Sequence, residues 1–167
     1  MGREAERWDA VEEAAELLLE GEPQRALGQL RDVLRDDPEN AYGFFYLATA
    51  LYEIERYDAA RDAFRAAVTL SPEYMGARVG LSHTLLRLGD AREALTVAEE
   101  TLARVADDGD SLYAAGCAAA ALGERASARK WFTKFLKSKP ELETQLEVQG
   151  FIDLLARGNE GDPLRLG

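Results

Sequence analysis

The chain has 167 residues, which is enough for one domain to bury a core. Its composition, 47% hydrophobic and 31% charged, is typical of a folded protein rather than a disordered one. The 31 acidic residues outnumber the 20 basic ones, and a net charge of −11 argues against binding to nucleic acid or to an anionic membrane surface. A single cysteine, Cys117, excludes an internal disulfide.

Segments with helical spacing of apolar residues follow one another along the chain. They predict helices at about 7–20, 23–36, 41–54, 57–70, 75–88, 91–104, 109–122 and 125–138. A further amphipathic segment predicts a helix at about 141–157, and residues 159–167 are predicted to form a flexible tail. No run of alternating β-branched residues indicates a strand, and no apolar run is long enough to insert into a membrane. We therefore expect an all-α, acidic, cytoplasmic protein.

Several residue types recur along the chain with a period of 34. An alanine occupies one position of every unit, at Ala26, Ala60, Ala94 and Ala128. Five residues earlier the chain has Gly21, Glu55, Gly89 and Gly123. A glycine there is expected to end the first helix of each pair in a left-handed conformation. Prolines follow three of the alanines by twelve residues, at Pro38, Pro72 and Pro140, and are expected to end the second helix.

This pattern resembles the tetratricopeptide repeat family, whose unit is a 34-residue pair of helices. Residues 41–74 match the family best, with Leu47, Ala48, Tyr57, Ala60, Phe64, Ala67 and Pro72 at the expected positions. The resemblance implies a right-handed α-solenoid of antiparallel helix pairs. It also implies a single domain over residues 1–158, with repeats at about 7–40, 41–74, 75–108 and 109–142 followed by a capping helix at about 141–157.

Residues with catalytic potential are few and scattered. His83 has no second histidine or cysteine near it in sequence that would complete a metal site. Cys117 lies among small apolar residues that would not lower its thiol pKa. No glycine-rich loop is present that would bind a phosphate. We expect no catalytic residue, no cofactor and no metal, and therefore a protein that is not an enzyme.

The resemblance implies that the first helix of each pair lines a concave groove. The groove positions it assigns are Tyr42, Phe45, Thr49, Tyr52, Val79, His83, Leu86, Tyr113 and Cys117. Family members that grip a terminal carboxylate use Lys, Arg and Asn at such positions, and here only Arg87, at the edge, is of that kind. An apolar and aromatic groove favours a hydrophobic or amphipathic peptide, bound as a helix or as a strand. Coverage of the groove by the chain's own termini is an open alternative.

Two interpretations of function follow from these residues. The first is an adaptor or scaffold that binds a protein or peptide partner. The second is a dedicated chaperone for an aggregation-prone client, because the chain is similar in size and acidity to the class II chaperones of type III secretion. The acidic segment 1–22 and the basic segment 125–139 also raise head-to-tail self-association, with solvated helix faces as the alternative.

Overall fold

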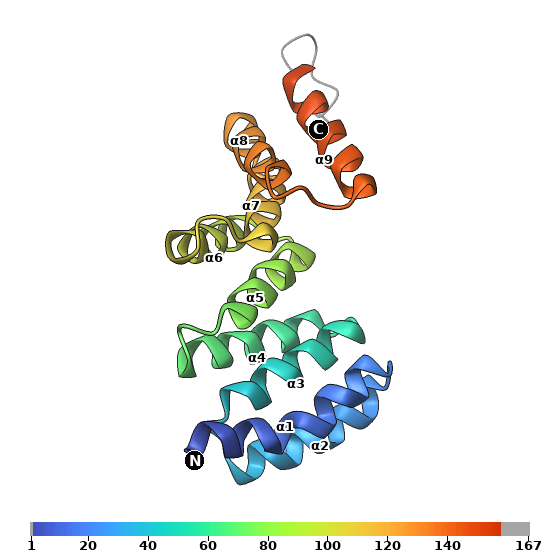
Figure 1. The fold of residues 1–167 in the computed structure, drawn as a ribbon, viewed down its shortest axis with the longest axis vertical. Coiled ribbons are helices and arrows are strands. Elements are labelled where there is room, and N and C mark those ends of the chain that lie inside the picture. Colours follow the sequence, from blue (N-terminus) through green and yellow to red (C-terminus); the bar gives the residue numbers. More distant parts are fainter. Residues whose placement is uncertain (1, 158–167) are drawn as a thin grey trace. The chain divides into compact units, whose positions relative to one another are not determined.

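The structure, a computed structural model, describes residues 2–157 as α-helices joined by short turns, with no strand among those residues (Figure 1). The helices are α1 (Arg3–Leu19), α2 (Pro23–Asp36), α3 (Ala41–Glu53), α4 (Tyr57–Leu70), α5 (Met75–Leu88), α6 (Ala91–Arg104), α7 (Gly109–Ala121), α8 (Arg125–Leu136) and α9 (Leu142–Arg157). The predicted tail at 159–167 lies outside the described residues.

The helix bounds agree closely with the sequence pattern. Helices α2, α4, α5 and α6 have the predicted bounds, and α3, α7, α8 and α9 differ from them by one or two residues. The largest difference is at α1, which begins at Arg3 rather than at residue 7. Its first turn is polar, so apolar spacing does not reveal it, but Glu4 and Glu6 are favourable beside the positive end of a helix dipole.

One position in each predicted 34-residue repeat has left-handed backbone geometry. The φ angle is +76° at Gly21, +61° at Glu55, +82° at Gly89 and +74° at Gly123. Each of these residues follows the first helix of a predicted pair, so the expectation of a left-handed helix end is confirmed at all four positions. Glu55 is the one member that has a side chain, and an L-residue in this conformation costs about 1–2 kcal/mol.

The chain divides into two compact units that meet in sequence between Leu88 and Gly89. In the first unit, α1 packs on α2 and α3, while α3 also packs on α4 and α5. In the second unit, α6 packs on α7, α7 on α8, and α8 on α9. The pairing of α5 with α6 as one repeat, and the assignment of the whole chain to a single domain, stay predictions.

Small side chains lie where helices approach each other. Ala26, Ala60, Ala94 and Ala128 are completely buried, as the 34-residue period predicts. The buried Phe132 ring lies so close to Gly116 that a Cβ atom there would be 2.5 Å from it. Since real Cβ contacts are longer than this, glycine at 116 allows α7 and α8 to pack closely.

Candidate functional site

Five aromatic side chains gather in the first unit, and we call them the aromatic cluster: Trp8, Tyr42, Phe45, Tyr46 and Tyr74. The Tyr74 ring, from the residue before α5, lies 4.8 Å from Phe45 and 5.5 Å from Tyr42, centroid to centroid. Trp8 of α1 lies 5.7 Å from Tyr42 and 6.1 Å from Tyr46. The cluster therefore joins α1, α3 and the start of α5 through rings from three different parts of the chain.

Phe45, a predicted groove residue, lies between neighbouring helices. Its ring centroid is 5.9 Å from that of Phe64 on α4. On another side, a Cβ atom added at Gly76 of α5 would be 3.2 Å from the Phe45 ring. Phe45 thus contributes to the packing of α3 on α4 and α5, and Gly76 leaves the space that its ring needs.

The tyrosines of the cluster are held in their neutral form. Burial raises the pKa of Tyr42, Tyr46 and Tyr74 above the ordinary tyrosine value. Tyr42 also donates a hydrogen bond of 3.2 Å to Oε2 of Glu4, which raises the pKa of Tyr42 further. These hydroxyl groups therefore keep their protons at neutral pH.

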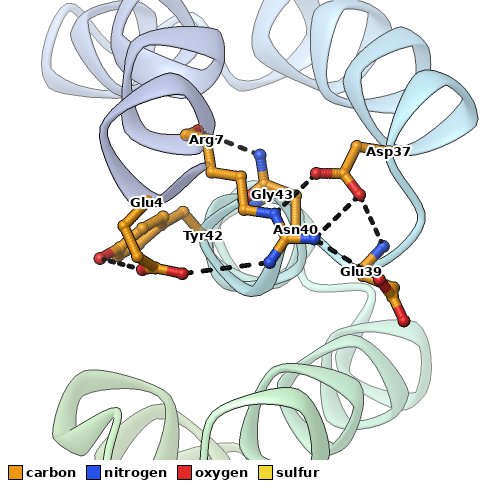
Figure 2. A network of polar contacts seen from close by, with 7 residues as sticks. All are labelled: Glu4, Arg7, Asp37, Glu39, Asn40, Tyr42 and Gly43. Carbon is orange, nitrogen blue, oxygen red and sulfur yellow. Dashed lines mark hydrogen bonds and ion pairs between the residues drawn. The ribbon is translucent and has the colours of Figure 1, made fainter. Parts of the chain in front are cut away.

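A polar network fixes α1 against the turn between α2 and α3 (Figure 2). Arg7 donates from Nε to Oδ2 of Asp37 at 2.7 Å and from Nη2 to Oδ1 at 3.2 Å. The hydrogen bond from Arg7 holds the pKa of Asp37 below its ordinary value. The buried Asn40 donates from Nδ2 to the carbonyl oxygen of Arg7 at 3.0 Å and accepts from the amide of Gly43 at 3.1 Å, so that it caps α3.

A hollow of about 440 Å³ opens beside this network, and we call it the acidic hollow. Aromatic rings from α3 and the α4–α5 turn form part of its lining, and three glutamates contribute carboxylates to it. The lining residues are Glu4, Arg7, Glu39, Ala41, Tyr42, Leu70, Ser71, Glu73 and Tyr74.

A second hollow of about 180 Å³ lies further along α3, and we call it the apolar hollow. It is lined by Thr49, Tyr52, Phe64, Gly80 and His83. A Cβ atom at Gly80 would lie 2.4 Å from the Phe64 ring, so only glycine fits between α5 and that ring. Three predicted groove residues, Thr49, Tyr52 and His83, are thus brought together around one hollow.

An arginine lies beside Tyr52, one of the residues that line the apolar hollow. Arg87 donates from Nε to the Tyr52 hydroxyl at 3.2 Å, and its guanidinium lies 5.7 Å from the centre of the Tyr57 ring. Tyr52 and Tyr57 in turn contact each other edge to face, with centroids 5.2 Å apart. The guanidinium is therefore held against two aromatic side chains by cation–π attraction and a hydrogen bond.

The remaining predicted groove residues are more dispersed. Val79 and Leu86 are half-buried on α5 and line neither hollow. Tyr113 and Cys117 belong to the second unit, on α7, where the Tyr113 ring lies 5.5 Å from Phe135. Burial raises the pKa of Tyr113 to about 12 and raises that of the Cys117 thiol, so neither group is poised as a nucleophile or base.

Two further structural features bear on function. Among residues 2–157, no group of three or more His, Cys, Asp or Glu side chains is placed to hold a metal ion. Within the same part of the chain, no helix is both long and apolar enough to cross a membrane.

Sequence profiles described as tetratricopeptide repeat match residues 11–74, 55–120 and 109–142. The chain belongs to the tetratricopeptide repeat family. The predicted family membership is therefore confirmed over most of the sequence. No curated protein matches the sequence.

Solved structures show the same fold. MamA (residues 41 to the end) from Desulfovibrio magneticus RS-1 has a TM-score of 0.72 at 20% identity, covering 96% of this chain and 99% of that one. YrrB, described as a tetratricopeptide protein with an unusual peptide-binding site, has a TM-score of 0.78 at 18% identity, covering 90% and 76%. PilW, described as a type IV pilus biogenesis factor, has a TM-score of 0.74 at 18% identity, covering 89% and 74%.

These likenesses confirm the all-α solenoid class, and family membership places the chain among protein–protein interaction modules, which are generally not catalytic. The groove positions predicted from the sequence do not include Tyr46 or Tyr74 of the aromatic cluster. A signal for Tyr74 exists, since it occupies the repeat position of Asn40 and Asp108, which cap α3 and α7. An aromatic residue at a capping position indicates a different role for that turn.

Proposed function

We propose that this protein is a non-enzymatic adaptor whose first unit binds a hydrophobic or amphipathic segment of a partner protein along α3 and α5. The observation that carries the proposal is the apolar hollow, which Thr49, Tyr52 and His83 line together with Gly80 and the Phe64 ring. A hollow of about 180 Å³ is large enough to receive one aliphatic side chain. Burying such a side chain contributes about 1.5–3 kcal/mol.

Hydrogen bonds around the hollow keep its walls in place before a partner arrives. The Thr49 hydroxyl donates to the Phe45 carbonyl oxygen at 3.0 Å, and the Tyr52 hydroxyl accepts from Arg87. A preformed site loses less side-chain freedom on binding than a flexible one. The description of YrrB as a peptide-binding protein of the same fold supports a peptide as the first ligand to test.

The test is to fill the apolar hollow. Thr49→Leu places extra methyl groups inside it, and Thr69→Leu, at an exposed position on α4, is the matched control. Random twelve-residue peptides displayed on phage are selected on the wild-type protein, and the affinities of the enriched peptides are then measured for both variants. We expect enrichment of peptides with a Leu, Ile or Phe anchor, and an affinity at least about tenfold weaker for Thr49→Leu alone. Equal affinity for all three proteins would show that the hollow is not the anchor site.

Several finer interpretations stay predictions from the sequence. They are the part of Val79, Leu86, Tyr113 and Cys117 in the groove, the dedicated-chaperone alternative, the exclusion of nucleic acid, a cytoplasmic location and head-to-tail self-association. A chaperone would keep an aggregation-prone client soluble on co-expression, whereas an adaptor would bind its partner without that effect.

A further inference from the structure

The acidic hollow differs in chemistry from the apolar one, although both lie along α3. Its walls include the rings of Tyr42 and Tyr74, which are 5.5 Å apart and meet at an interplanar angle of 71°. The side chains of Glu4 and Glu39 are 75% and 67% exposed, so their carboxylates are open to solvent and to a ligand. The hollow therefore combines aromatic faces with accessible negative charge.

The charge of the hollow is negative even when its own arginine is counted. Arg7 is the one base among the lining residues, against the carboxylates of Glu4, Glu39 and Glu73. Its strongest contacts go to Asp37, which does not line the hollow, and its distances to Glu39 and Glu4 are longer, 3.7 and 4.0 Å. The lining thus has one guanidinium and three carboxylates, so an anionic ligand is disfavoured and a cationic one is favoured.

Within the same compact unit, the protein already holds a guanidinium against aromatic side chains. Arg87 lies over the Tyr57 ring and donates to the Tyr52 hydroxyl. A planar guanidinium suits such a place better than an ammonium group, because it stacks on rings and donates to carboxylates in a fixed fork.

We infer that the acidic hollow is a specificity pocket for an arginine side chain of the partner segment, with Tyr42 and Tyr74 as its aromatic wall and Glu4 and Glu39 as its carboxylates. This inference rests on the proposed function, since it gives the peptide that fills the apolar hollow a second anchor. Together the two hollows bind one basic and one apolar residue of the partner segment.

The spacing of the two anchors follows from α3. Tyr42 lines the acidic hollow and Thr49 lines the apolar one, on the same face of the helix. Seven residues of α-helix rise by about 10 Å. An extended partner therefore places its arginine about three residues from its apolar anchor, and a helical partner about seven residues from it.

The experiment uses two probes of equal shape, N-acetyl-argininamide and its neutral analogue N-acetyl-citrullinamide, in an NMR titration of the full chain at low salt. We expect the arginine probe to shift the backbone amides of residues 41–43 and 73–75 in a saturable manner and the citrulline probe to leave them unchanged. In Glu4→Gln/Glu39→Gln the arginine probe binds about fivefold more weakly. The matched control Glu12→Gln/Glu13→Gln, which removes two exposed acids of α1 outside the hollow, keeps wild-type binding. Melting curves of each variant confirm that it is folded.

Each other outcome has a defined meaning. Equal shifts from the two probes, or non-saturable shifts spread over all acidic residues, overturn the arginine pocket. Titration with N-acetyl-leucinamide, read at residues 49, 52 and 83, tests the apolar hollow separately. A response to the leucine probe without one to the arginine probe would therefore leave the proposed function standing and remove only the pocket.

Discussion

The side-chain amide of Asn40 donates to the carbonyl oxygen of Arg7 at 3.0 Å, across thirty-three residues of chain. The same side chain accepts from the Gly43 amide and begins α3. One buried residue thus both starts the helix that carries the candidate site and ties that helix to α1. The two functions can be separated experimentally, because the equivalent residue Asp108 caps α7 through the Ser111 amide alone.

We predict that Asn40→Ala lowers the free energy of unfolding by about 2 kcal/mol, because it removes both a helix cap and the hydrogen bond from a buried side chain to α1. Asp108→Ala, which removes only a cap, lowers it by about 1 kcal/mol. Urea unfolding followed by circular dichroism measures both values. Equal losses would mean that the bond to Arg7 adds nothing to stability.

Glu55 has a φ angle of +61° at a position where the other predicted repeats have glycine. We predict that Glu55→Gly raises the free energy of unfolding by about 0.5–1 kcal/mol, since the relief of left-handed strain exceeds the extra freedom of the unfolded chain. Gly123→Ala, the reverse change at the equivalent position, lowers it by about 1 kcal/mol. The midpoints of urea unfolding give the comparison, and a destabilised Glu55→Gly protein would contradict the argument.

Burial raises the pKa of Tyr113 to about 12, against an ordinary value near 10. Between these values the unfolded chain loses this proton while the folded chain keeps it, so stability falls as the pH rises through that range. We predict that Tyr113→Phe makes the fall between pH 10 and pH 12 shallower. Thermal melts at pH 9, 10 and 11 follow the effect, with Tyr57→Phe as the control. Parallel curves for wild type and Tyr113→Phe would refute the linkage.

The basic face of α8 offers a test of self-association. The Lys130 and Lys134 ammonium groups lie 5.0 and 5.1 Å from the centre of the Trp131 ring, and both lysines are exposed. If this face binds the acidic α1 of another copy, light scattering finds a larger mass at low salt than at high salt, because salt screens exposed charges. Lys130→Glu/Lys134→Glu abolishes the difference. A monomeric mass at both salt concentrations would contradict head-to-tail self-association.

The 34-residue period predicted the fold well because the residues that set it are local and repeated. Ala60 and Ala94 are buried for the same packing reason, and Gly21 and Gly123 share the same backbone geometry. The sequence missed the first turn of α1, since that turn is stabilised by its charge and by the hydrogen bond that Glu4 accepts from the distant Tyr42 rather than by an apolar stripe.

The candidate site was predicted less completely. The sequence pattern shows on which face of a helix a residue lies, but not which residues of other helices it contacts. Thr49, Tyr52 and His83 meet as a shared face would predict, whereas Phe45 on that same face is packed against Phe64 and Tyr74. The acidic hollow depends on Tyr74, which lies in a turn outside every predicted helix. Such a contact arises from tertiary packing and leaves no periodic signal.

Asn40, Tyr74 and Asp108 share one position of the repeat but differ in what they do. An engineer who builds a consensus array from these units would place Asn or Asp at all three turns and would obtain well-capped helices. That array would lack the Tyr74 ring, and with it one wall of the acidic hollow. The acidic hollow thus depends on a deviation from the repeat average, so grafting this surface onto another scaffold requires this turn together with α3.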